Sequence, residues 1–171
     1  MRVIGIDPGS VRTGWGVVDE SGSRLSVAGC GVIEAEGNAF ADRLAHIFRE
    51  LRGIVGQYRP EEAGVEQAFT AKNAATALKL GQARGVAVAA CAANGVPVFD
   101  YEPRLVKKNI VGTGTAEKEQ VAFMVSRILG MDTDGMLPDA TDALGIAICH
   151  LSMRRMRLLE RETAKNSRRR V

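Results

Sequence analysis

The chain has 171 residues, of which 46% are hydrophobic and 25% are charged, with a formal net charge of +3. This length and balance predict one globular domain at residues 1–160 with a basic, flexible tail at residues 161–171, and they leave little room for a second domain. The N-terminal segment MRVIGIDPGS lacks a long apolar stretch. We therefore expect no signal peptide, no membrane anchor and a cytoplasmic location.

The N-terminal part of the chain predicts three strands in succession. Residues 3–6 form a buried strand that ends at Asp7, and a Pro-Gly turn leads into a second strand at residues 13–18. A third strand at residues 25–33 completes an antiparallel meander.

Two helices separated by a short strand follow. Apolar residues at helical spacing predict a helix at residues 40–58 with Asn38 as its cap. A short extended segment at residues 63–67 predicts a strand, and an alanine- and glycine-rich helix at residues 73–93 follows it. The second helix carries small residues at every fourth position, and this spacing favours close packing on the sheet or on another helix over dimerisation. This small-residue stripe consists of Ala77, Gly81, Gly85 and Ala89.

The C-terminal part predicts one more strand and two helices. Residues 96–101 form the fifth strand, and a basic, glycine-containing connection spans residues 104–115. A helix capped by Thr115 runs to Leu129, and the last helix spans residues 138–160. This order is that of an α/β ribonuclease H-like fold, a mixed five-stranded sheet with an N-terminal antiparallel meander and helices on both faces. A fold alone establishes no activity.

The cysteines and histidines limit the kind of metal site that the chain can hold. Cys30, Cys91 and Cys149 are far apart and lie among apolar or small residues, unlike a disulfide framework or paired zinc ligands, so we expect three buried thiols. The histidines are His46 and His150. Any metal must then be held mainly by oxygen, which favours Mg²⁺ or Mn²⁺.

Two aspartates at the start of the last predicted helix are candidates for one shared site. Asp139 and Asp142 are three residues apart, so both project from one face with roughly 4.5 Å of axial rise between them. Ala143, Ile146 and Ala147 continue that face, which predicts that both carboxylates turn toward the core. Burying a carboxylate is costly unless a cation or several donors meet it, and no neighbour in the sequence supplies them. A metal ion would, although acidic residues also suit a helix N-terminus without one.

Asp7 and Glu66 each end a predicted strand, where side chains of different strands converge at one edge of a sheet. Either could also be a plain turn residue or an exposed strand end. Four carboxylates around one spot repel each other, and two divalent ions roughly 3.5–4 Å apart would satisfy them and hold a scissile phosphate. The sequence therefore predicts metal-assisted phosphodiester hydrolysis, with the four acids as catalytic and metal-binding residues.

Several short segments spread across nearly the whole chain form a recognisable set. They are IGIDPGS at 4–10, VEQ at 65–67, KNAATALKLGQARG at 72–85, PRLVKK at 103–108, VGTG at 111–114, AEK at 116–118 and LPDATDA at 137–143. In this order they resemble the RuvC family of crossover junction endodeoxyribonucleases. The resemblance implies a homodimer that binds the four-way junction made in recombination and cuts two strands of like polarity symmetrically. It also implies Mg²⁺, as two ions per active site with Mn²⁺ as a substitute, and cooperation with a branch-migration complex of the RuvA and RuvB type.

The family's functional positions fall on particular residues of this chain. The four acids occupy its metal-binding positions, although some relatives carry histidine where this chain has Asp139, which leaves the metal preference open. Lys107 and Lys118 occupy basic positions associated with DNA contact and catalysis. The resemblance also places Phe69 beside the active site, where it could stack on an unpaired base, whereas most phenylalanines are buried core residues.

Basic residues are further candidates for DNA contact. A nuclease must hold phosphate backbones beside its own acidic site, so flanking cations are required and binding should weaken steeply with salt. Besides Phe69, the candidates are Lys72, Lys79, Arg84, Lys107, Lys108 and Lys118. A second basic cluster lies near the C-terminus, where phosphate contact and a solvated terminus are both open. It consists of Arg154, Arg155, Arg157, Arg161, Lys165, Arg168, Arg169 and Arg170.

Two other functions agree with parts of the pattern. The segment GIDPGS, with Thr13 and Gly14 after it, also resembles the phosphate loop of actin-like ATPases, but those enzymes close two related domains over the nucleotide and this chain is long enough for one. A non-catalytic junction-binding module would keep the basic residues without needing four acids. We exclude His150 from the site because it lies two helical turns beyond Asp142, roughly 12 Å along the axis.

Overall fold

The sheet contains five strands in the order β3-β2-β1-β4-β5. They are β1 (Arg2–Asp7), β2 (Arg12–Ser21), β3 (Arg24–Glu34), β4 (Glu62–Glu66) and β5 (Val98–Tyr101). The computed structural model describes residues 1–67, 73–133 and 135–168, with side chains described to residue 160. β2 pairs antiparallel with β1 and β3, whereas β4 pairs parallel with β1 and β5. The predicted mixed sheet with its N-terminal meander is confirmed.

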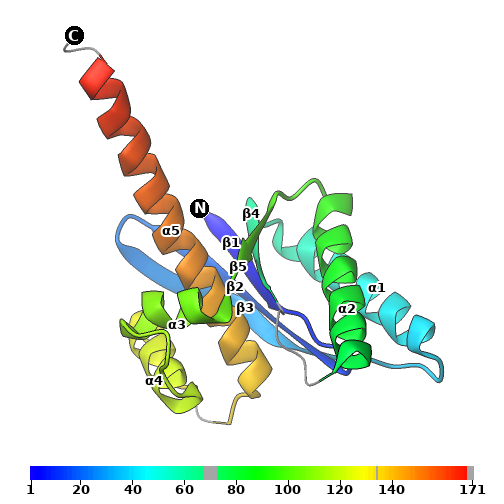
Figure 1. Ribbon diagram of the computed structural model, residues 1–171. Coiled ribbons are helices and arrows are strands. Elements are labelled where there is room, and N and C mark those ends of the chain that lie inside the picture. Colours follow the sequence, from blue (N-terminus) through cyan, green and yellow to red (C-terminus); the bar gives the residue numbers. More distant parts are fainter. Residues whose placement is uncertain (68–72, 134, 169–171) are drawn as a thin grey trace.

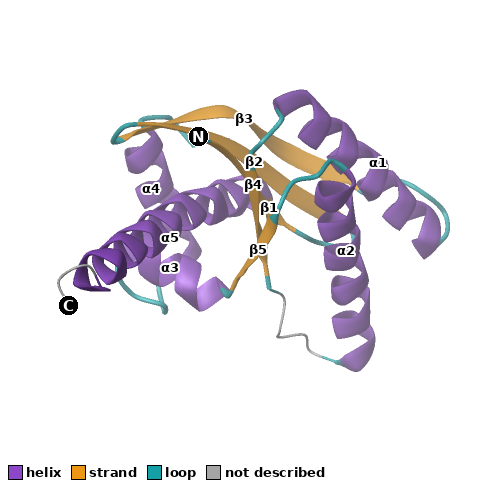
Figure 2. Ribbon diagram, turned by 90° about the horizontal axis from the view of Figure 1, so that it is seen from above, coloured by secondary structure: helices purple, strands orange, loops and turns teal. Residues whose placement is uncertain are grey.

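Helices cover both faces of the sheet, as predicted. They are α1 (Phe40–Tyr58), α2 (Ala74–Ala93), α3 (Pro103–Val111), α4 (Lys118–Leu129) and α5 (Pro138–Arg168). α1 and α2 lie on one face, while α3, α4 and α5 lie on the other, and the end of α5 projects away from the sheet (Figure 1, Figure 2). Within the described ranges, none of these helices combines the length and the apolar character needed to cross a membrane.

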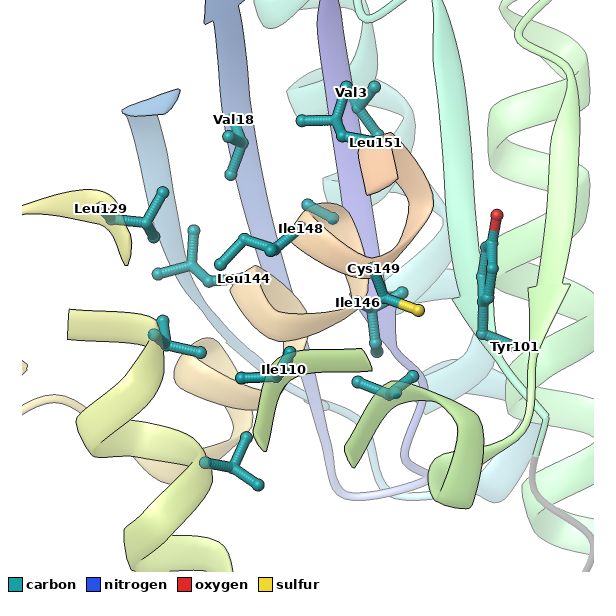
Figure 3. Close-up of a cluster of buried hydrophobic side chains, with 14 of the residues drawn as sticks. Val3, Val18, Tyr101, Ile110, Leu129, Leu144, Ile146, Ile148, Cys149 and Leu151 are labelled. Carbon is teal, nitrogen blue, oxygen red and sulfur yellow. The ribbon is translucent and has the colours of Figure 1, made fainter. Parts of the chain in front are cut away.

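Each face of the sheet has its own hydrophobic core, because alternate residues of a strand point to opposite sides. In β1, Val3 packs with α3, α4 and α5, whereas Ile4 and Ile6 pack with α1 and α2. In β2, Val18 belongs to the core with α3, α4 and α5, whereas Val17 belongs to the core with α1 and α2. Figure 3 shows the first core, which gathers side chains from the strands and from α5.

α5 lies in backbone contact with β1 and β2 because glycines face it. A Cβ atom at Gly5 would collide with the carbonyl of Ala143, and one at Gly14 would collide with the backbone of Asp139. Gly16 also abuts this helix. The glycines therefore set the height of α5 above the strands, and with it the position of the two α5 aspartates relative to the end of β1.

The predicted connection at residues 104–115 is wrong in its first part, because Pro103–Val111 form α3. Pro103 occupies the first turn, and Gly112 ends the helix with a φ of 93°. Val106 and Ile110 are buried four residues apart, which gives the helix an apolar side. The basic residues between them hid this short pattern in the sequence.

The start of α4 also differs from the prediction. The helix begins at Lys118, with Glu117 rather than Thr115 as its cap. The backbone N–H of Glu117 donates to Oε1 of Gln120 at 3.0 Å, while the hydroxyl of Thr115 pairs with that of Thr113. This hydrogen bond from the Glu117 backbone to the Gln120 side chain therefore replaces the expected threonine cap.

Two other helix ends were predicted wrongly. α1 is capped at Ala39 rather than Asn38, and the N–H of Ala39 donates to the carboxylate of Asp42. α5 continues to Arg168, beyond its predicted end at Glu160. The helix thus extends into the segment predicted as a tail.

Two predictions about small side chains are corrected by the structure. The small-residue stripe does not pack on the sheet, because its four residues are exposed and a Cβ atom at Gly81 or Gly85 would meet nothing within 4 Å. Cys30 is half-buried, whereas Cys91 and Cys149 are buried as predicted. The buried side of α2 is offset from the stripe and consists of Ala83, Ala87, Ala90 and Cys91.

Candidate active site

Acids from three elements meet at one edge of the sheet. β1 and β4 are parallel neighbours, so Asp7 and Glu66 leave the sheet side by side. Asp142 of α5 joins them, and the three acids line one cavity of about 270 Å³. The other lining residues come from α3 and α4 and are Pro103, Val106, Lys107, Lys118 and Val121. The structure thus brings three of the four predicted acids into one hollow.

Asp139 lies beside this cavity and is not among its lining residues. It precedes Asp142 by about one helical turn, and its Oδ2 atom is 3.5 Å from Nε of Arg12 at the start of β2. Its charge still acts on the cavity, since it is one of the charges that raise the pKa of Asp7. Asp139 therefore contributes to the electrostatics of the acid cluster while facing a partner of its own.

Asp7 and Glu66 form a half-buried, hydrogen-bonded pair. Burial, and then the negative charge of Asp142, raises the pKa of Asp7 from 3.8 to about 6. Burial, and then the charge of Asp7, raises the pKa of Glu66 from 4.5 to about 8. Both shifts favour the retention of a proton on the pair near neutral pH, because two carboxylates in contact repel each other when both are ionised. A divalent ion would displace that proton.

Both aspartates of α5 already have basic partners. Nζ of Lys118 is 3.3 Å from Oδ2 of Asp142, and the charge of Asp142 raises the pKa of Lys118. Arg12 meets Asp139 from β2. Both cations come from elements distant in the sequence, so a metal ion is not the only group that can offset the charge of these carboxylates.

The ligand atoms at the cluster fit divalent ions that prefer oxygen. Asp7, Glu66, Asp142 and the neighbouring Asp139 offer carboxylate oxygens, the ligands that Mg²⁺ and Mn²⁺ favour. In the part of the chain that the structure describes, no three acidic, histidine or cysteine side chains are arranged to hold an ion as they stand. Two of the carboxylates instead face basic side chains, which compete with an ion for them.

The remaining predicted DNA contacts near the cavity differ in their surroundings. Lys107 lines the cavity, and its Nζ donates to the carbonyl of Ala116 at 2.7 Å, which ties α3 to the segment before α4. Lys108 is exposed on α3. Phe69 and Lys72 lie outside the described residues, so their predicted roles stay predictions.

Two predicted DNA contacts on α2 interact with other parts of the protein. Nζ of Lys79 lies 5.9 Å from the ring centre of Phe40 on α1. Arg84 forms an ion pair with Asp100 of β5 at 2.5 Å. Neither residue lines the cavity of the acid cluster.

The first C-terminal arginines contact the body of the protein. Their partners come from β2, β4 and β5, so these charges hold α5 against the sheet. The contacts are Arg154 with Glu62, Arg155 with Glu20, and Arg157 with the ring of Phe99. These three arginines of the C-terminal basic cluster therefore interact with side chains of the protein itself.

His150 lies deep in the fold and is absent from the cavity lining, in agreement with its exclusion from the site. Its Nδ1 is 2.9 Å from the hydroxyl of Tyr101, and its Nε2 is 2.7 Å from Oε2 of Glu62. Burial lowers the pKa of His150, although the hydrogen bond to Glu62 opposes this shift. The histidine joins α5 to β4 and β5 behind the acid cluster.

Sequence reasoning missed several residues of the site. Arg12 follows the turn after Asp7, but no spacing pattern pairs it with Asp139. Val106 and Val121 form apolar walls of the cavity, and α3 had to be recognised before Val106 could be placed. The available signal for Arg12 was its place in the sequence shortly after Asp7, the acid at the end of the first predicted strand.

This fold, with carboxylates at adjoining strand ends and at the start of α5, defines a nuclease of the ribonuclease H-like class. The yeast mitochondrial Holliday junction resolvase Ydc2 shares the fold, with a TM-score of 0.55 at 15% identity, covering 86% of this chain and 76% of that one.

Closer similarities identify the family. The family model of the crossover junction endodeoxyribonuclease RuvC matches residues 3–150. The crossover junction endodeoxyribonuclease RuvC of Oleidesulfovibrio alaskensis is 57% identical over 159 residues, which covers 93% of this chain and 95% of that protein. The structure of T. thermophilus RuvC in complex with a Holliday junction substrate has a TM-score of 0.85 at 34% identity and covers 91% of this chain and 96% of that one. The chain therefore belongs to the RuvC family of crossover junction endodeoxyribonucleases.

Proposed function

We propose that this protein resolves four-way DNA junctions by paired, symmetric nicks in strands of like polarity, leaving 5′-phosphate and 3′-hydroxyl ends, in DNA recombination and repair. The observation that carries this proposal is the convergence of Asp7, Glu66 and Asp142 in one cavity with Lys107 and Lys118. The acids alone would repel a phosphate backbone, whereas lysines in the same cavity attract one. Family membership supports a junction as the substrate.

Mg²⁺ is the cofactor that we propose, as two ions per site with Mn²⁺ as a substitute. Asp7, Glu66 and Asp142 would hold the ions, and Asp139 would complete the set after leaving Arg12. Bound ions supply an activated water and stabilise the charge that develops on the leaving 3′ oxygen. The chain's own contribution is to hold these acids at strand ends and on a helix in direct contact with the strands.

Lys118 and Lys107 would contribute positive charge in two ways. The side chain of Lys118 is 71% exposed, so its ion pair with Asp142 is weak and can be exchanged for a phosphate. Lys107 is held by the carbonyl of Ala116, so it offers a charge of fixed position in the cavity wall. Both effects favour a phosphate lying over the acids.

We further propose a homodimer that forms through the exposed stripe of α2. The stripe borders an apolar groove of about 560 Å³ between α1 and α2, and glycine permits the close approach of a second helix. A twofold dimer would present two equivalent sites, as two symmetric nicks require. The groove is lined by Leu44, Ala45, Phe48, Arg49, Gln82, Gly85, Val86 and Ala89.

Sedimentation of two glycine variants tests the dimer. Gly85→Glu places a charge in the proposed interface and should produce a monomer. Gly53→Glu is the matched control, because Gly53 is also an exposed helical glycine with nothing within 4 Å of a Cβ position. An unchanged dimer for Gly85→Glu contradicts this interface.

Family membership also supports a proposal about where the protein acts and with which partner. We propose that the protein acts in the cytoplasm together with a branch-migration complex of the RuvA and RuvB type. Such a complex would deliver junctions to the acid cluster. Co-elution of the protein with a junction bound by that complex, but not with the junction-free complex, is the expected result.

The activity is tested by mapping cuts in a four-way junction and in a linear duplex of matching sequence, with and without Mg²⁺. We expect paired cuts at symmetric positions of the junction, dependent on the metal. Equal cutting of both substrates would mean a general nuclease. Junction binding without cutting in either Mg²⁺ or Mn²⁺ would mean a non-catalytic binding module.

A further inference from the structure

The turn between β1 and β2 is held firmly while presenting two side chains to solvent. The hydroxyl of the buried Thr13 donates to the carbonyl of Gly9 at 3.0 Å, and the carbonyl of Val11 accepts from the N–H of Ala35 at 2.8 Å. Val11 is nevertheless 63% exposed, and the side chain of Arg12 is 48% exposed. The backbone of this turn is fixed, and its side chains are accessible.

Arg12 lies at the acid cluster because of how β2 meets α5. Gly14 is opposite Asp7 in the β1–β2 register, and it contacts the backbone of Asp139. Arg12 is two residues earlier on the same strand, so it points to the same side of the sheet as Gly14. Its Nε is 3.5 Å from Oδ2 of Asp139. A partly exposed pair of this length is weak, so the pair separates easily.

Lys118 of α4 pairs with Asp142 in the same way as Arg12 of β2 pairs with Asp139. It meets Asp142 at 3.3 Å with a largely exposed side chain. Each α5 aspartate is thus loosely held by one cation, from β2 in one case and from α4 in the other. Divalent ions that bind the aspartates would repel both cations, which would then turn to the nearest negative groups. Over a nuclease site these groups are phosphates.

We propose that the β1–β2 turn is a DNA-contacting element, in which Arg12 exchanges Asp139 for a backbone phosphate that flanks the cleaved bond. This inference rests on the proposed function as a junction nuclease. The planar guanidinium group can donate two hydrogen bonds to a phosphate. Arg12 touches no reacting atom, so it is a binding residue that adds a phosphate contact from the β2 side of the acid cluster.

Junction binding as a function of salt tests the inference. Affinity is measured in Ca²⁺ for the wild type, Arg12→Ala, Arg12→Lys and the control Arg24→Ala. Arg24 is also an exposed arginine, but it lies at the other end of the β2–β3 ladder, paired with Ser21, whereas Arg12 is paired with Glu34. Arg12→Ala should bind about three- to tenfold more weakly, and its slope of log K against log salt should be smaller by about 1. Arg12→Lys should recover the slope, and Arg24→Ala should match the wild type.

The outcomes separate this inference from the function on which it rests. If the wild type binds and cuts junctions while Arg12→Ala keeps the wild-type affinity and slope, the contact is refuted and the nuclease stands. If the wild type neither binds nor cuts junctions, both fail.

Binding of Mn²⁺ without DNA gives a second readout. Arg12→Ala should bind Mn²⁺ about two- to fivefold more tightly, because Asp139 loses a competing cation. Its thermal stability should stay close to that of the wild type. Equal or weaker Mn²⁺ binding, or a large loss of stability, would mean that Arg12 is a structural support and would overturn the exchange.

Discussion

Glycines serve opposite purposes on the strands and on α2. Those of β1 and β2 face α5 and bring its backbone into contact with the sheet. Gly81 and Gly85 of α2 face solvent and meet nothing. The first set places two aspartates beside the strand-end acids, whereas the second leaves a smooth helix surface open to a partner. A small residue therefore permits close approach, and the surrounding fold decides which element approaches.

The largest effect should come from a change at Asp7, the strand-end acid that lies near the two aspartates of α5. Asp7→Asn should reduce metal-dependent junction cutting by roughly a thousandfold or more, because a proposed metal ligand is lost. Junction binding should persist or strengthen, since one charge that repels phosphate is gone. The measurement is single-turnover cutting beside gel-shift affinity.

Asp19→Asn is the control for this change, since Asp19 pairs with Arg2 at the far end of β1. It should cut at a rate near that of the wild type. Normal cutting by Asp7→Asn would contradict the assigned acid cluster.

The contact between β1 and α5 is broken directly by Gly5→Ala. Its new Cβ atom would overlap the Ala143 carbonyl, so we expect a loss of about 1–3 kcal/mol or more in the free energy of unfolding. Urea denaturation measures this loss. Gly53→Ala, in an exposed helical position with open space, should instead gain roughly 0.5–1 kcal/mol. Similar effects of the two substitutions would mean that the glycines of β1 do not seat the helix.

The pH dependence of stability tests the hydrogen-bonded pair of Asp7 and Glu66. Folding raises the pKa of Asp7 and Glu66, so the folded metal-free protein binds more protons than the unfolded chain. Their stabilising contribution is complete below about pH 4, and it is lost as the pH rises through about 6 for Asp7 and about 8 for Glu66. Thermal unfolding in EDTA should show the decline, and Mg²⁺ should reverse it at pH 8. A variant with Asp7→Asn and Glu66→Gln should decline less, and a parallel decline would refute the shared proton.

The smallest effect is expected where α5 leaves the sheet. Arg155→Ala removes a partly exposed ion pair with Glu20, which should cost about 1 kcal/mol or less. The salt dependence of junction binding should not change, because this arginine is engaged by the protein itself. A slope reduced by about 1 would reassign Arg155 to DNA contact.

The fold was largely predictable because its signals are local. Short apolar runs and turn residues marked the strands of the meander, and apolar residues at helical spacing marked α1. The alanine- and glycine-rich composition marked α2. α3 was missed because its buried side consists of two residues four apart within a basic segment. The cap at Glu117 was missed because a nearby threonine is the stronger capping signal in sequence.

The acids of the site were also predictable in kind, whereas their partners were not. Helical spacing relates Asp139 and Asp142 directly. The pairings of these acids with Arg12 and Lys118 join residues that are far apart in the chain, and no periodicity reports such contacts. The C-terminal arginines show the same limit, because their acidic partners lie on distant strands.

The sequence by itself determined the mixed sheet and the family and predicted a metal site with oxygen ligands, because residue types, periodicities and contiguous motifs are properties of the chain. Only the tertiary structure decided which acids line the cavity, which cations hold them and which side of α2 is exposed. Burial and through-space charge arise when distant elements pack together, and these give Asp7 and Glu66 their raised pKa and leave the glycines of α2 uncovered.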